Sequence, residues 1–235
     1  MRRGKKKVNT LTTILIAVAV FAGVLALSVF IQLYNSPDFQ GFDRDPAPDP
    51  DVTIQGGGET GEGQEGSAPF NWQDHQVFII GDSLTEGAKR EIDKAIPNAT
   101  IDGRTSRTMS TGVQILQEWK DSGILTDDAI IVICLANNIT GTTQSDAQTI
   151  VDMVQPGQSL IMMTGHGRSN MAPANEFIRS LPNVYPFVTV ADWDLTIAQS
   201  PNLLSDDGVH IARNQGNVLY AELIVRALEV AKPRP

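Results

Sequence analysis

One unbroken apolar run, residues 129–135, constrains the fold of this chain more than any other feature. It reads Ala-Ile-Ile-Val-Ile-Cys-Leu, without alternation between polar and apolar positions. A strand of this kind is covered on both faces, as in a parallel sheet that lies between two layers of helices. The run therefore predicts a central strand of an α/β domain.

Shorter apolar runs alternate along the chain with segments whose apolar residues recur at helical spacing. The predicted strands are residues 77–80, 99–101, 129–135, 160–163 and 184–190. The predicted helices are residues 84–95, 113–119, 145–154, 174–181 and 214–231. This alternation predicts an α/β domain over residues 71–235, a three-layer sandwich with a mainly parallel five-stranded sheet.

Residues 1–33 differ in composition from the predicted domain. Residues 1–10 contain five basic side chains, and residues 11–33 are almost wholly apolar and uncharged. A helix over residues 11–33 would be roughly 34 Å long, enough to cross a hydrocarbon core of about 30 Å. Because basic residues stay in the cytoplasm, we predict a cytoplasmic N-terminus, a single-pass transmembrane helix in the cell membrane and an extracytoplasmic C-terminal domain. A cleaved signal peptide with a processing site at Ala26-Leu27-Ser28 is the alternative.

Residues 34–70 form a predicted linker between the anchor and the domain. They are rich in proline, glycine and acidic residues and offer almost nothing apolar to bury, so we expect disorder. Two interpretations stay open. The linker is either a tether that lets the domain reach into the cell envelope or a solubilising spacer without a specific partner.

Charge and cysteine content exclude several classes of protein. The formal net charge is −9, and the chain after residue 10 is acidic, which argues against nucleic acid as a partner. The single cysteine, Cys134, lies in the apolar run and can form neither an internal disulfide nor a cysteine-based zinc site. No group of His, Asp and Glu has the spacing of metal ligands, so we expect no metal and no cofactor.

Two short motifs supply the side chains of a nucleophilic site. Gly81-Asp82-Ser83-Leu84 follows the first predicted strand and leads into a helix, and Asp207-Gly208-Val209-His210 lies beyond the last strand. Ligands of parallel sheets bind beyond the carboxyl ends of the strands, where both motifs are expected. A serine at a helix N-terminus, with an Asp and a His three residues apart, matches the parts of a Ser-His-Asp site. The simpler interpretation of Ser83 is a helix N-cap.

These motifs, together with Asn138, resemble the first, third and fifth sequence blocks of the GDSL/SGNH hydrolase family. The resemblance covers roughly residues 77–235 and implies the flavodoxin-like SGNH fold. It further implies that Ser83 is the nucleophile, His210 the general base and Asp207 the residue that orients it. Asn138 would donate its side-chain amide to the oxyanion, beside the backbone N–H of Ser83.

The match departs from the family pattern at two places. The third block usually reads Gly-x-Asn-Asp, but here it is Ala136-Asn137-Asn138-Ile139, so Asn137 remains an alternative oxyanion donor. In the second block Ser106 takes the position of a glycine whose backbone N–H completes the oxyanion hole. The resemblance implies that the Ser106 N–H can still donate there.

Four segments narrow the resemblance to one group within the family. They are similar to the extracytoplasmic SGNH domains of peptidoglycan and polysaccharide O-acetyltransferases, and they are residues 103–108, 175–177, 191–193 and 206–210. In such proteins the domain is usually fused to a membrane acyltransferase with many spans. With a single predicted span, this chain would need a separate membrane protein as acyl donor in order to act as a transferase.

Two further residues near the predicted site are weaker candidates for substrate contact. His166 follows the fourth predicted strand, and Arg107 lies close to Arg104 in the second block. An imidazole or a guanidinium group there could bind a glycan. The alternatives are a surface-loop histidine and solvated arginines.

The sequence predicts a membrane-anchored extracytoplasmic serine esterase. Its expected substrate is an acylated carbohydrate of the cell envelope, with acetyl as the expected acyl group and an acyl-enzyme on Ser83 as intermediate. An O-acetyltransferase of peptidoglycan or polysaccharide would use the same side chains, with a sugar hydroxyl in place of water. A non-catalytic carbohydrate-binding module is the third possibility.

Overall fold

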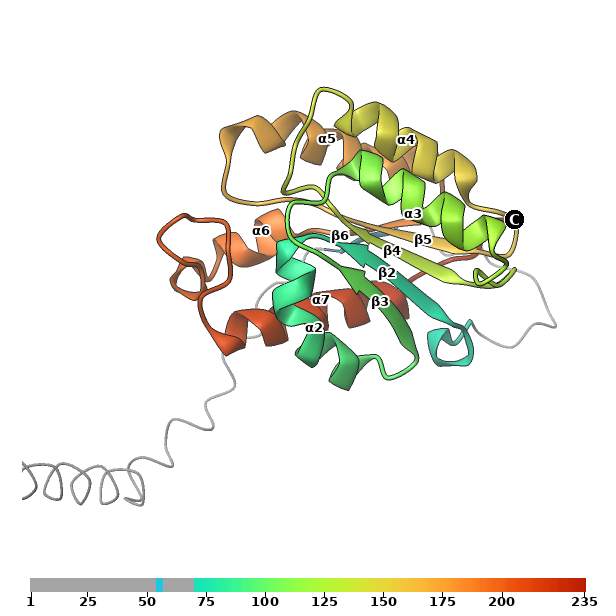
Figure 1. Cartoon of the computed structure of the whole chain (residues 1–235), viewed down its shortest axis with the longest axis horizontal. Helices are drawn as coiled ribbons and strands as arrows, with labels where there is room; N and C mark the ends of the chain where they lie inside the picture. Colours follow the sequence, from blue (N-terminus) through green and yellow to red (C-terminus); the bar gives the residue numbers. More distant parts are fainter. Residues whose placement is uncertain (1–53, 57–69) are drawn as a thin grey trace, which may run out of the picture. The chain divides into compact units, whose positions relative to one another are not determined.

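A computed structural model describes residues 54–56 and 70–235 of the chain (Figure 1). The predicted cytoplasmic N-terminus, the predicted transmembrane helix over residues 11–33 and most of the predicted linker lie outside the described residues. Within the described residues, no helix combines the length and the apolar character needed to cross a membrane.

Five parallel strands form most of the sheet, as the alternating pattern predicts. They are β2 (Val77–Gly81), β3 (Ala99–Gly103), β4 (Ile130–Cys134), β5 (Ser159–Met163) and β6 (Val188–Ala191). β4 lies between β2 and β5, and all neighbouring pairs among these five strands are parallel. Every residue of β2 and β4 is buried, which agrees with the unbroken apolar run. The α/β class and the five-stranded parallel sheet are confirmed.

One strand lies where the sequence predicts a linker. β1 (Ile54–Gly56) pairs antiparallel with β6, so the full order in the sheet is β1-β6-β5-β4-β2-β3. For this segment the expected disorder is wrong. The edge of β6 presents backbone N–H and C=O groups that a neighbouring segment can satisfy whatever its side chains. Composition reports on apolar burial and therefore does not predict such pairing.

Helices cover both faces of the sheet, which confirms the three layers (Figure 1). One face packs against α2 (Ser83–Ala95), α6 (Trp193–Ala198) and α7 (Asn214–Glu229). The other face packs against α3 (Met109–Asp121), α4 (Thr143–Met153) and α5 (Ala172–Ser180). The described residues also contain four short 3-10 turns: η2 (Trp72–Asp74), η3 (Ser169–Met171), η4 (Leu181–Asn183) and η5 (Pro201–Leu203).

Several element boundaries differ from those predicted, two of them because of turns. α4 begins at Thr143, before the predicted start at residue 145, and the Ser145 hydroxyl donates to Thr142 O at 2.9 Å within the first turn. β6 begins at Val188, later than predicted, because the preceding residues leave α5 through the turn η4. Both errors arise where short-range hydrogen bonds of turns compete with the pattern of apolar residues.

Replacement of Ile133 by alanine should lower the free energy of unfolding by about 2–5 kcal/mol, because it leaves a cavity between the layers. Ile133 lies in β4 and is 0% exposed. The matched control is Ile124→Ala, whose side chain is 52% exposed and should change stability by about 0.5 kcal/mol or less. Urea denaturation followed by tryptophan fluorescence measures both values. Equal effects of the two substitutions would contradict the central position of β4.

Candidate active site

Ser83 is the first residue of α2 and comes just after the carboxyl end of β2. The residue before it, Asp82, is the N-cap of α2, and its Oδ1 accepts a hydrogen bond from Leu84 N–H at 3.0 Å. The interpretation of Ser83 as the N-cap is therefore wrong, because Asp82 has that position. Ser83 is partly exposed, at a helix N-terminus whose N–H groups create a positive potential.

The hydroxyl of Ser83 contacts an imidazole from the far end of the chain. Ser83 Oγ lies 3.0 Å from His210 Nε2, and His210 Nδ1 lies 2.6 Å from Asp207 Oδ2. The fold thus brings three of the predicted site residues together, although 127 positions separate Ser83 from His210. A hydroxyl, an imidazole and a carboxylate in this order are the groups that activate a serine for attack on an ester.

Local hydrogen bonds hold the Asp207 carboxylate in place. Its Oδ1 accepts from Val209 N–H and His210 N–H, each at 2.9 Å, and from the Ser205 hydroxyl at 2.7 Å. Gly208 turns the chain between Asp207 and Val209, and its φ of 67° lies in the left-handed region that favours glycine. The spacing Asp-Gly-Val-His therefore suffices for the carboxylate to reach the imidazole within one turn.

These hydrogen bonds also keep Asp207 ionised. The contact with His210 is the main reason that the pKa of Asp207 lies well below its usual range, and the bonds from Ser205 and from two backbone N–H groups lower this pKa further. A carboxylate beside Nδ1 favours the tautomer with its proton on Nδ1, so Nε2 faces Ser83 as an acceptor. The side chains of His210 and Asp207 are 49% and 50% exposed, so water reaches both.

The two asparagines that follow β4 have different surroundings. Asn137 is 5% exposed, with Nδ2 donating to Asp82 Oδ2 at 3.3 Å and Oδ1 accepting from His166 N–H at 3.0 Å. Asn138 is partly exposed, and its Nδ2 donates to Arg107 O at 2.9 Å. The amide of Asn137 thus joins the turn at Asp82 to the loop of His166. The bond to Arg107 needs only one of the two N–H groups of Asn138, so the other can donate to a ligand.

Ser106 and Arg107 lie in the loop that follows β3. Ser106 has φ of 65°, a left-handed conformation that is uncommon for residues other than glycine. The guanidinium of Arg107 donates to the main-chain oxygen of Asp102 at 2.5 Å and to its carboxylate at 2.7 Å. On the other side of the loop, Glu86 Oε2 accepts from Thr105 N–H at 2.7 Å. The guanidinium of Arg107 is thus engaged with Asp102 at the end of β3, while Ser106 has the backbone conformation of a glycine.

His166 follows β5 at the same edge of the sheet. Its Nδ1 lies 2.8 Å from Asp194 Oδ1, and its side chain is 21% exposed. His166 does not contact Ser83 in the way His210 does; its ring is oriented by Asp194. Asp194 was not predicted as a site residue, although its place shortly after the last predicted strand puts it at the same edge of the sheet as His166.

Comparisons with known proteins support the same chemistry. No protein-family model matches the chain. The candidate peptidoglycan O-acetyltransferase YrhL of Bacillus subtilis (strain 168) is 26% identical over 154 residues, which are 66% of this chain and 24% of YrhL. The chain spans about a quarter of the length of the curated relatives it matches.

Two solved structures share the fold. The C-terminal catalytic domain of peptidoglycan O-acetyltransferase A (OatA) from Streptococcus pneumoniae, a methylsulfonyl adduct, matches with a TM-score of 0.63 and 25% identity, over 68% of this chain and 96% of that domain. A lipolytic protein of the G-D-S-L family from Veillonella parvula matches with a TM-score of 0.50 and 14% identity, over 65% of this chain and 97% of its own.

The described domain is thus similar in sequence to peptidoglycan O-acetyltransferases and shares its fold with a GDSL protein. The predicted relationship to the SGNH domains of peptidoglycan O-acetyltransferases is confirmed. These relatives are named as enzymes, which supports an acyl-transferring or esterase role over the predicted alternative of a non-catalytic carbohydrate-binding module.

Next to Ser83, the described domain buries the carboxyl group of Asp82, for which the sequence motif predicted no separate role. Asp82 is 0% exposed, and burial raises its pKa to about 6, although hydrogen bonds from Leu84 N–H and Asn137 act in the opposite direction. A signal was present in the sequence, since an aspartate directly before a helix is a preferred N-cap. The cap and the bond to Asn137 connect the turn that carries Ser83 to the loop after β4.

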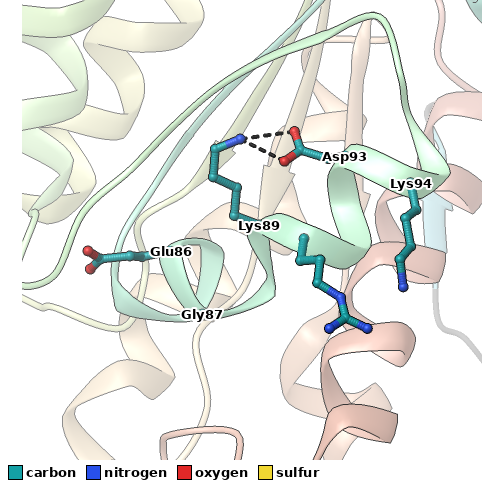
Figure 2. Close-up of a pocket in the computed structure, with 6 residues that line it drawn as sticks. Glu86, Gly87, Lys89, Asp93 and Lys94 are labelled. Atoms are coloured by element: carbon teal, nitrogen blue, oxygen red, sulfur yellow. Dashed lines mark hydrogen bonds and ion pairs between the residues drawn. The ribbon is translucent and has the colours of Figure 1, made fainter.

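A hollow in the surface of the described domain lies along α2 (Figure 2). Its lining residues are Glu86, Gly87, Lys89, Arg90, Asp93 and Lys94. Lys89 Nζ pairs with the Asp93 carboxylate at 2.8 Å, as Figure 2 shows, and Lys94 Nζ pairs with Glu91 at 2.8 Å. Such pairs are typical of a solvated helix face. In the described part of the chain, no group of three or more His, Cys, Asp or Glu side chains is placed to hold a metal ion.

Asp82→Asn should flatten the pH dependence of stability between about pH 4 and pH 6. Burial raises the pKa of Asp82 from 3.8 to about 6, so in this range the folded state binds more protons than the unfolded state. In the wild-type chain this group therefore makes the free energy of unfolding fall as the pH rises through that window, by about 3 kcal/mol. Urea denaturation at several pH values measures the slope.

The matched control for this measurement is Asp93→Asn, which removes a carboxyl group whose side chain is 49% exposed. It should leave the slope between pH 4 and pH 6 close to that of the wild-type chain. If Asp82→Asn also keeps the wild-type slope, the carboxyl group of Asp82 does not titrate in this window and the account of its burial is wrong.

Proposed function

We propose that this SGNH domain is a serine O-acetyltransferase that acts on peptidoglycan through an acetyl-enzyme on Ser83. The observation that carries the proposal is the contact of 3.0 Å between Ser83 Oγ and His210 Nε2, with Asp207 2.6 Å from the other ring nitrogen. The acetyl group and peptidoglycan are supported by the similarity to OatA and YrhL, whose names give this activity.

In the first step, Ser83 Oγ attacks the carbonyl carbon of an acetyl ester. His210 Nε2 takes the hydroxyl proton and then gives it to the alcohol that leaves, so an acetyl-serine and a free alcohol result. The ionised Asp207 stabilises the imidazolium that forms between these two proton transfers. The lowered pKa of Asp207 supports this role, because the carboxylate then keeps its charge at neutral pH.

The negative charge on the carbonyl oxygen requires donors that are in place before the reaction. We assign the side-chain amide of Asn138 and the backbone N–H groups of Ser83 and Ser106 to this task. Asn138 is favoured over Asn137 because both polar atoms of Asn137 are used between Asp82 and His166, and because Asn137 is 5% exposed. The left-handed conformation of Ser106 supports a role for its N–H, since it gives this loop the backbone shape of a glycine.

In the second step, a hydroxyl group of the acceptor sugar attacks the acetyl-serine. His210 Nε2 removes the proton from that hydroxyl, the bond between the acetyl carbon and Ser83 Oγ breaks, and the proton returns to Ser83. The product is an O-acetylated sugar, and the enzyme returns to its starting state. This step needs an open path to the acetyl-serine, which the half-exposed His210 supplies.

Hydrolysis of the same acetyl-enzyme is a second candidate function, and one observation favours it. Because the side chains of His210 and Asp207 are about half exposed, water can take the place of the sugar hydroxyl. The domain would then be an esterase that removes acetyl groups from cell-envelope carbohydrate. Mass spectrometry of the products formed from an acetyl donor and a glycan acceptor separates the two functions.

We place this activity outside the cell membrane. The proposal rests on the five basic residues within residues 1–10 and on the uncharged apolar residues 11–33, which together have the pattern of a single-pass anchor with its N-terminus in the cytoplasm. For an acetyl group supplied from the cytoplasm, we propose a membrane protein as the acetyl donor.

Ser83→Ala should remove nearly all hydrolysis of 4-nitrophenyl acetate by the full-length chain, because no other group takes the place of the nucleophile. Ser122→Ala is the matched control: Ser122 lies at the end of α3, where its hydroxyl donates to Trp119 O, and its removal should leave turnover unchanged. Release of 4-nitrophenolate measures turnover, and intact-mass spectrometry detects the acetyl-enzyme. Undiminished turnover in Ser83→Ala would exclude Ser83 as the nucleophile.

Asn138→Ala should lower kcat for the same ester by about 100–1000-fold, the usual loss when one oxyanion donor is removed. The comparison is Asn137→Ala, which should act mainly by loosening the loops that its amide joins and should therefore lower the thermal unfolding temperature more than Asn138→Ala does. A loss of kcat confined to Asn137→Ala, without loss of stability, would transfer the oxyanion role to Asn137.

A further inference from the structure

A second histidine–aspartate pair lies beside the proposed triad and has the same geometry. His166 Nδ1 is 2.8 Å from Asp194 Oδ1, as His210 Nδ1 is 2.6 Å from Asp207 Oδ2. A carboxylate beside Nδ1 favours the tautomer with the proton on that nitrogen, so Nε2 carries a lone pair. In His210 this second nitrogen contacts Ser83. In His166 it is the acceptor atom of a side chain that is 21% exposed.

The carboxylate of Asp194 is held in one orientation by its neighbours. Arg179 Nη2 donates to Asp194 Oδ2 at 2.9 Å, and the same guanidinium donates through Nε and Nη2 to the buried Asp192 at 2.6 and 2.8 Å. The backbone N–H of Asp194 donates to the Thr164 hydroxyl at 3.0 Å. Because Arg179 occupies one oxygen of Asp194 and His166 the other, the imidazole has a defined direction before any ligand arrives.

The backbone of His166 is equally constrained. Gly165 N–H donates to Asn175 Oδ1 at 2.9 Å, and Asn175 Nδ2 donates back to Gly165 O at 2.7 Å. A Cβ on Gly165 would lie 2.2 Å from Ala136 O, and a Cβ on Gly167 would lie 2.2 Å from Gly208 O. The loop of His166 therefore packs directly between the loop that leads to Asn138 and the turn that carries His210.

The charges around His166 select the kind of ligand. Arg179 contributes one positive charge and Asp192 and Asp194 contribute two negative charges, so the group is negative overall when the imidazole is neutral. An anion is disfavoured next to such a group. A neutral hydroxyl group, which donates a hydrogen bond to a lone pair without bringing charge, matches Nε2.

We infer that His166 is a substrate-binding residue whose Nε2 accepts a hydrogen bond from a sugar hydroxyl, with Asp194 and Arg179 as its positioning residues. This inference rests on the proposed function, since it places the carbohydrate beside the acetyl-serine. It adds a specific contact to that function, on the side of the site formed by β5 and β6.

Binding of a soluble N-acetylglucosamine oligomer to the full-length chain tests the inference. The measurement uses the Ser83→Ala chain, so that no turnover occurs, and follows the ring resonances of the three histidines by NMR. The oligomer should shift the resonance of His166, and His166→Ala in this background should raise the Kd by about 5–10-fold. His166→Gln, which keeps an acceptor oxygen, should recover part of the affinity and replaces the alanine variant if that variant does not fold.

His75 provides the matched control. Its Nδ1 lies 3.2 Å from Asp128 Oδ2, but both residues come before the amino ends of strands, β2 and β4, at the opposite edge of the sheet. The oligomer should not shift the resonance of His75, and His75→Ala should not change the Kd. The inference is overturned if the oligomer does not bind, if the resonance of His166 does not shift, or if neither substitution of His166 weakens binding. Failure of the proposed function is detected separately, as 4-nitrophenyl acetate turnover that survives Ser83→Ala.

Discussion

Burial of the central strands on both faces is the constraint on which the rest of the structure depends. β2 and β4 have no exposed residue, so each connection between parallel strands must return across a face of the sheet as a helix. All carboxyl ends of the parallel strands then meet at one edge. Polar residues that are far apart in the chain, such as Ser83, Asn138 and His166, become neighbours there without any attraction between them being needed to shape the fold.

At that edge, hydrogen bonds between loops take over from apolar packing. Asp82 caps α2 and accepts from Asn137, and Asn137 in turn accepts from the backbone of His166. This chain of contacts crosses the loops after β2, β4 and β5. It keeps a carboxyl group in a buried position, which is unfavourable for its charged form and is reflected in its raised pKa. The unfavourable burial is located next to the proposed nucleophile, where precise positions matter most.

Much of the fold and of the candidate site could be predicted from the sequence, because the signals are local. The run around Ile133 identifies a central strand, and the motifs around Ser83 and His210 are each read within a few residues. The remaining features depend on contacts between distant segments. The pairing of β1 with β6 uses backbone groups that every sequence has, and the pair of His166 with Asp194 joins the segments that follow β5 and β6. The choice between Asn137 and Asn138 as oxyanion donor depends on side-chain orientation, which the spacing of residues in the sequence does not determine.

The half-exposed imidazole of His210 has a kinetic consequence. In a site open to solvent, water and the acceptor hydroxyl compete to attack the acetyl-enzyme. The ratio of these two reaction rates determines which product forms. An acceptor that diffuses freely has little advantage in that ratio, whereas a hydroxyl held in line with the acetyl carbon reaches an effective molarity of about 10⁵ M or more. The residence time of the glycan, with its hydroxyl aligned with the acetyl carbon, would then determine whether such a domain adds or removes acetyl groups.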